Sequence, residues 1–114
     1  MKPLPVLDKI RKLQRAGIAP HGTIRSLPEW VECCRMLIAK DGTWLLVEPG
    51  TQVEKHTPGQ FVIDLPAERY MVEIFDLTNR KWISCESAAG GPLVAGLPCT
   101  GNPLVIRIRV SRSS

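Results

Sequence analysis

Hydrophobic and polar residues alternate along most of the chain beyond residue 33. A period of two is the pattern of a pleated strand with one buried face. The alternation is clearest in the segments 70–75 and 104–110. The residues expected to face inward are Tyr70, Val72 and Ile74 in the first segment and Leu104, Ile106, Ile108 and Val110 in the second. The residues expected on the opposite face include Met71, Glu73, Phe75, Arg107 and Arg109.

Turn residues separate these segments from one another. Asp41-Gly42 lies between the apolar runs 34–39 and 43–48, and it predicts a tight hairpin because both residues accept the positive φ of a type I′ turn. Asp76, Thr78 and Asn79 predict a second hairpin turn, in which Asn79 best accepts positive φ. Further strands are expected at 60–65 and 93–95, with a flexible stretch at 87–91. Six or seven short strands of this kind predict an all-β fold, a small antiparallel β-sandwich or partly open barrel.

The N-terminal region has a different pattern. Apolar residues recur at helical spacing between Val6 and Ala16, with lysines and arginines at the remaining positions, which predicts a short amphipathic helix. About three turns of helix are marginal alone in water, so the apolar stripe must pack against another element or a partner. Proline and glycine dominate the segment 18–28, which indicates a linker. We therefore divide the chain into an N-terminal helix and linker, 1–32, and a β domain, 33–114.

Size and charge refine this picture only slightly. A chain of 114 residues that is 44% hydrophobic can bury one core without a bound metal or disulfide bonds, so one β domain is expected. Fifteen Lys and Arg against 11 Asp and Glu give a formal charge of +4. This excess is concentrated near the first helix and the last strand, where it is explained either by a solvated surface or by a patch that attracts anions.

The four cysteines, Cys33, Cys34, Cys85 and Cys99, contain no C-x-x-C pair, so no metal site and no cofactor are expected. In a strand, Cys33 and Cys34 would point to opposite faces, and only one could enter the core. Cys85 and Cys99 could form a disulfide outside the cytosol, or all four could remain reduced thiols that act as small hydrophobic residues.

The sequence shows no segment for membrane insertion or export. No stretch approaches the roughly 20 apolar residues that span a bilayer, and no apolar core follows the first five residues. Neither a transmembrane segment nor a signal peptide is therefore expected in this chain. An extracellular or periplasmic location would follow if it belongs to an exported enzyme.

Motifs for catalysis are missing. The chain has no glycine-rich phosphate loop and no G-x-S-x-G element, and its carboxylates form no directed pair. A cysteine hydrolase using Cys85 or Cys99 with His21 or His56 rests on composition alone. We therefore expect a protein that is not an enzyme.

Aromatic and arginine side chains are the remaining candidates for function. Flat indole rings suit sugar rings, proline rings and unstacked bases, although a small domain needs most of its aromatic residues as core. Trp44 or Trp82 is expected to fill the interior, whereas Phe75 is expected to be partly exposed. The candidate binding residues are Trp44, Phe75, Trp82, Arg107 and Arg109. Alternating arginines on an outer strand are also explained by protection of a sheet edge.

The order of these elements resembles a known module. Residues 39–47 (AKDGTWLLV), 62–66 (VIDLP) and 72–82 (VEIFDLTNRKW) are similar to a bacterial β-sandwich module to which collagen binding has been attributed. In the proteins of that family, the module is C-terminal to a glycosidase-like TIM barrel. Leu77 stands where the family usually has proline, and Asn79 where it usually has glycine. The resemblance covers about residues 34–110 and implies a non-catalytic accessory module of a carbohydrate-active enzyme.

The leading hypothesis is therefore an accessory β-sandwich that packs on a catalytic glycosidase-like domain or binds polysaccharide or matrix protein. The alternative is a free-standing basic module that binds nucleic acid through the first helix and the last strand. No membrane partner is expected, and the sequence leaves the ligand and the oligomeric state open.

Overall fold

The structure, a computed structural model, describes residues 11–13, 15, 24–39, 42–50, 59–98 and 100–111. The described residues form eight strands: β1 (Ile24–Ser26), β2 (Val31–Ala39), β3 (Gly42–Pro49), β4 (Gly59–Ile63), β5 (Arg69–Asp76), β6 (Lys81–Ala89), β7 (Leu93–Leu97) and β8 (Leu104–Val110). Every pairing among them is antiparallel. The all-β architecture expected from the alternation is confirmed, with more strands than the six or seven expected.

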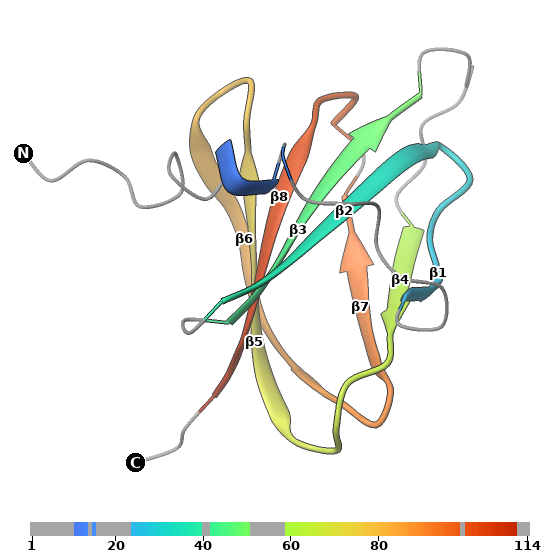
Figure 1. The fold of residues 1–114 in the computed structure, drawn as a ribbon, viewed down its shortest axis with the longest axis vertical. Coiled ribbons are helices and arrows are strands. Elements are labelled where there is room, and N and C mark those ends of the chain that lie inside the picture. The colour runs from blue at the N-terminus through green and yellow to red at the C-terminus, as the bar shows by residue number, and fades with distance from the viewer. Residues whose placement is uncertain are drawn as a thin grey trace, which may run out of the picture.

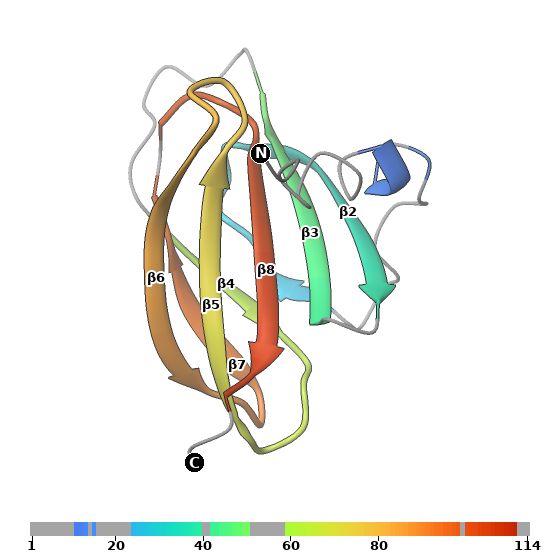
Figure 2. The same ribbon diagram turned by 90° about the vertical axis from the view of Figure 1, so that its left-hand side faces the viewer.

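The strands form two layers. One is a five-stranded sheet in the order β2-β3-β8-β5-β6, and the other is a three-stranded sheet in the order β1-β4-β7. Figure 1 shows the two layers facing each other, and Figure 2 shows the wider sheet in front of β4 and β7. The arrangement is sandwich-like. We call the side of the five-stranded sheet that faces the smaller sheet its inner face, and the opposite side its outer face.

The main core lies between the layers, because alternate residues of both sheets point into the same space. In β7, Leu93, Ala95 and Leu97 are buried while Val94 is exposed, as period two requires. The largest contributors from the smaller sheet are Phe61, Ile63, Leu93 and Leu97, and those from the inner face include Leu45, Val72, Ile74, Leu104 and Ile106. The predicted inward faces of 70–75 and 104–110 are thus confirmed, except that Val110 is 46% exposed at the end of its strand.

A second, smaller apolar cluster lies on the outer face. It contains Leu13, Trp44, Leu46, Phe75 and Val105, with Leu37 and Leu77 packed against it. Residues 11–13 and 15 are helical, and Leu13 is fully buried in this cluster. The apolar stripe expected between Val6 and Ala16 therefore packs on the β domain at Leu13, while the other positions of that stripe lie outside the described residues.

Two regions differ from the sequence expectations. The segment taken as a linker contributes β1, which pairs with β4, and Trp30 just beyond it is buried in the main core. The stretch expected to be flexible at 87–91 instead continues β6 as far as Ala89, where Ala89 pairs with Arg69. Cross-strand pairing with β5 provides the order that the small residues themselves do not encode.

The two predicted hairpins are present, but their turns differ in detail. Ala39 pairs with Gly42, so Gly42 begins β3 instead of completing the turn. It has φ +132°, and a Cβ there would lie 2.5 Å from the carbonyl oxygen of Ile108, which explains the glycine. In the second hairpin the residue with positive φ is Arg80, at 54°, and not Asn79. Asn79 is instead held by Asp76.

Candidate functional site

The five candidate binding residues come together on the outer face. Trp44 lies opposite Arg107 across β3 and β8, and Phe75 lies opposite Trp82 across β5 and β6. Glu73 of β5 lies opposite Arg107 on its other side. Since β8 is paired on both sides, its arginines do not protect a sheet edge. The strand register thus brings together residues from four strands.

Arg107 is the centre of this group. Its guanidinium lies 5.4 Å from the ring centroid of Trp44 and 5.3 Å from that of Trp82. It also donates two hydrogen bonds to Glu73, from Nε to Oε1 at 3.0 Å and from Nη2 to Oε2 at 2.8 Å. Such a fork-to-carboxylate pair fixes geometry as well as charge. Arg107 therefore links both tryptophans and the neighbouring carboxylate into one ordered cluster.

A second arginine shares the same carboxylate. Arg109 Nε forms an ion pair with Glu73 Oε1 at 2.9 Å, and the Arg109 side chain is 51% exposed whereas that of Glu73 is 13% exposed. Two guanidinium groups thus face one carboxylate. This Arg-Glu-Arg group keeps a net positive charge, and Arg109 presents that charge to solvent.

The aromatic rings differ in accessibility. Trp44 is fully buried, but in the outer cluster and not between the sheets as a core-filling tryptophan was expected to be. Phe75, expected to be partly exposed, is only 1% exposed because Leu13, Val105 and their neighbours cover it. Trp82 is 40% exposed, and its ring meets that of Phe75 edge to face with centroids 5.2 Å apart. Trp82 is therefore the candidate aromatic that can touch a ligand.

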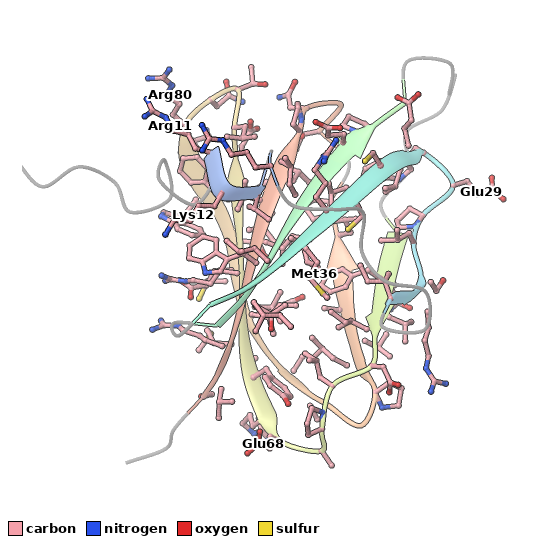
Figure 3. The ribbon with its side chains drawn as sticks, in the orientation of Figure 1. Arg11, Lys12, Glu29, Met36, Glu68 and Arg80 are labelled. Atoms are coloured by element: carbon pink, nitrogen blue, oxygen red, sulfur yellow. The ribbon has the colours of Figure 1, made fainter. Side chains whose placement is uncertain are left out.

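Additional cations surround this cluster. Arg69 occupies the same face of β5 as Glu73, and it donates a hydrogen bond to Ser87 Oγ at 3.3 Å. Arg11, Lys12 and Arg15 are exposed on the helical segment whose Leu13 packs against the sheet. Figure 3 shows Arg11, Lys12 and Arg80 on the side of the molecule where the outer face lies. The first helix and the last strand, separated in sequence, contribute to one basic face.

The structure also has a cleft that the sequence analysis did not anticipate. It has a volume of about 640 Å³ and opens between β6 and β7, the last strands of their respective sheets. The inner side of β6 is only partly covered: none of its residues is buried, although Ile83 and Ala88 pack against the main core. The lining side chains include Asp76, Asn79, Lys81, Ile83, Ser84, Glu86, Leu97, Thr100 and Asn102. No sequence signal could have found this cleft, because it results from the unequal widths of the two sheets.

Asp76 at the end of this cleft organises the turns around it. Its Oδ1 accepts hydrogen bonds from the backbone N–H groups of Thr78 and Asn79, at 2.9 and 3.1 Å. Its Oδ2 accepts from Nδ2 of Asn79 at 2.9 Å and of Asn102 at 3.4 Å. Burial acts to raise the pKa of Asp76, but the hydrogen bonds from Asn79, Asn102 and Thr78 outweigh it and hold the pKa below 3.8. The turn role predicted for Asp76 is confirmed.

The cysteine side chains differ in burial according to the face of the five-stranded sheet on which they lie. Cys34 enters the main core and Cys33 does not, as adjacent strand positions predict. Burial, together with the neighbouring Cys33, raises the pKa of Cys34 to about 12. Cys85 is an exposed free thiol whose Sγ lies 3.4 Å from Sδ of Met71. Cys99, His21 and His56 lie outside the described residues, so the structure gives no geometry for a cysteine–histidine pair.

Other candidate features can be stated for the described part of the chain. No group of three or more His, Cys, Asp and Glu side chains there could hold a metal ion. The helical positions described in this structure form no segment long and apolar enough to cross a membrane. Every buried side-chain nitrogen or oxygen among the described residues has a hydrogen-bond partner.

Comparison with known proteins adds nothing to this geometry. No family model, no curated protein and no solved structure matches the chain.

Proposed function

We propose that this protein is a non-catalytic accessory β-sandwich module that binds polysaccharide or matrix protein through the outer face of its five-stranded sheet. Attachment to a catalytic domain of a carbohydrate-active enzyme is part of the same proposal. The resemblance in the sequence motivates the enzyme association. The ligand-binding part is supported by the side chains of the outer face.

The observation that carries the proposal is the position of Trp82. Its ring is partly exposed, yet it is held by Phe75 on one side and by Arg107, which is itself fixed by Glu73. An aromatic ring that is already ordered loses little conformational entropy when a sugar or proline ring packs on it. A ring of this kind is suited to binding, whereas Trp44 is fully buried and lies against the other side of the cluster through Arg107.

Binding can be tested with the full chain and a panel of immobilised ligands: cellulose, chitin, xylan, sulfated dextran and fibrillar collagen. We expect at least one ligand to bind and to change the intrinsic tryptophan fluorescence. Replacement Trp82→Ala should lower the affinity about tenfold, as expected for the loss of one aromatic contact.

The matched control is Val94→Ala, which trims a side chain of similar exposure, 44%, on the smaller sheet. This variant should bind as the unchanged protein does. Binding to no member of the panel, or binding that Trp82→Ala leaves intact in a folded protein, would contradict the proposal.

A further inference from the structure

The outer face carries more positive than negative charge. Its described cations include Arg69, Arg107 and Arg109 on the strands, Arg80 in the β5–β6 turn, and Arg11, Lys12 and Arg15 on the helical segment. The outer positions of β3 and β5 supply the carboxylates Glu48 and Glu73. Glu73 is already shared by Arg107 and Arg109. A field of this sign attracts anionic ligands and raises their association rate.

The helical segment and the arginines of β8 belong to one continuous surface. Leu13 packs in the same cluster as Trp44, and the Trp44 ring lies against the Arg107 guanidinium. The charges of residues 11, 12 and 15 are therefore added to those of β8 on one side of the molecule. A ligand that spans this surface must carry several anionic groups spaced along its length.

The opposite side of the molecule differs. On β1 of the smaller sheet, Arg25 is paired with Asp64 at 3.4 Å, and both side chains are exposed. That pair is neutral as a whole. The described strands of the smaller sheet carry no other charged residue. Among the described strands, the excess of positive charge therefore lies on the outer face of the larger sheet.

We infer that the ligand of the outer face is an anionic polysaccharide, whose sulfate or carboxylate groups pair with the arginines while a sugar ring contacts Trp82. This inference rests on the proposed function and names its ligand class. Guanidinium groups bind such oxyanions through paired hydrogen bonds. Among the residues that the structure describes, Arg109 is engaged with Glu73 through Nε, and its side chain is 51% exposed.

The aromatic residues favour a polysaccharide over a nucleic acid. Proteins that bind single-stranded nucleic acid stack successive bases on several exposed rings. On the described outer face Trp44 and Phe75 are buried, which leaves Trp82 as a single partly exposed ring. A series of stacking platforms is therefore missing from this face, whereas its charges fit an anionic chain.

The test compares dextran sulfate with unsulfated dextran, which share a backbone and differ only in charge. By titration calorimetry at low salt we expect the full chain to bind dextran sulfate and not dextran. The affinity should fall steeply when salt is raised from about 50 to about 200 mM, because bound counterions are released. Replacement Arg109→Gln should weaken binding about tenfold, the loss of one charge-assisted contact, and Arg11→Gln should act in the same direction.

Arg25→Gln is the matched control, because it removes the same charge from the opposite sheet. It should leave the affinity for dextran sulfate within about twofold, a change too small to represent a lost contact. Equal losses for Arg25→Gln and Arg109→Gln would overturn the inference, since they would indicate a response to net charge alone. Tighter binding to a single-stranded thymidine oligonucleotide than to dextran sulfate would overturn it too.

Failure of this inference can be separated from failure of the proposed function. If collagen or a neutral glycan binds in a Trp82-dependent manner while dextran sulfate does not, the proposed function stands and the anionic ligand is wrong. If no ligand binds, both are wrong. Circular dichroism is the folding control: each variant should give the same β-strand signal as the unchanged protein.

Discussion

The two faces of the five-stranded sheet have the same backbone but different chemistry. On β5, Tyr70, Val72 and Ile74 point inward and are all buried in the main core. On the outward side of the same strand, Glu73 is charged and Phe75 belongs to the smaller cluster. The inner face is covered by a second sheet along most of its width, whereas the outer face is covered in part by the segment that carries Leu13. The layer that covers each face therefore determines which face contributes most to the free energy of folding and which remains accessible to ligands.

The outer face compensates for its incomplete cover with directional interactions. The ion pairs of Glu73 and the ring contacts of Arg107 each contribute about 1 kcal/mol or less net, because partly exposed charges remain hydrated. Their main effect is to fix geometry. The inner face instead gains free energy from apolar area and close packing, which is larger and less specific.

Two buried phenylalanines give the sharpest stability test of this comparison. Phe61→Ala in the main core should lower the free energy of unfolding by about 4 kcal/mol, since it removes a fully buried ring between the sheets. Phe75→Ala should cost about 1 kcal/mol less, because Phe75 belongs to the smaller outer cluster, in which the neighbours can relax more easily into the space left behind. Urea unfolding measures both. An equal or larger loss for Phe75→Ala would mean that the outer face also forms a major core.

Two carboxylates of β5 provide a second test. Asp76 is held by neutral donors at the cleft, whereas Glu73 is held by two arginines. Since the pKa of folded Asp76 is lowered, its stabilisation is present above its ordinary value of 3.8 and is lost as the pH falls through the lower, folded value. We expect Asp76→Asn to cost about 2 kcal/mol at about pH 7 and progressively less below about pH 4.

Glu73→Gln should behave differently from Asp76→Asn. It should cost about 1 kcal/mol at low ionic strength and less in about 1 M salt, because its partners are charged and partly exposed. Unfolding curves at two salt concentrations distinguish the variants.

A cost of Asp76→Asn that stays constant on acidification would refute the assignment of Asp76 as the ionised anchor of the turn.

Alkylation of the two cysteines distinguishes the faces of the sheet by accessibility, without a change in stability. At about pH 8, iodoacetamide should modify Cys85 in the folded protein, because this free thiol is exposed to solvent. Cys34 should remain unmodified in the folded protein, because it is buried and its pKa is raised to about 12. Mass spectrometry of the two peptides measures this, with urea-unfolded protein as the control. Rapid modification of Cys34 would mean that the inner face opens readily.

The strands with strong alternation could be predicted, and those with weak patterns could not. The bounds of β8 follow from its regular sequence, and β5 and the start of β6 follow from the turn at Asp76. By contrast, β1 is three residues long, too short for a period to be visible, and it exists because β4 offers it an edge. The last part of β6 is rich in small residues and is ordered by pairing with β5. Local pattern is informative only where a strand carries its own hydrophobic face.

Residue type could nominate the candidate residues, but neither their proximity nor their exposure could be predicted from the sequence. Residue type selected Trp44, Phe75, Trp82, Arg107 and Arg109, and strand register placed them together. The sequence could not reveal that Leu13 would help to bury Phe75, or that Glu73 would be shared by two arginines. These facts depend on contacts between residues that are distant in the chain.

By itself, the sequence determined an antiparallel all-β protein with two hairpins and strands that each bury one face, because period two and turn chemistry act over a few neighbouring residues. The tertiary structure alone decided that one sheet would be wider than the other and that a cleft would open beside β6. It also decided that the described cations of the helical segment and of β8 would share one face. Those outcomes depend on which surfaces cover one another, and burial and electrostatic fields are summed over the whole fold.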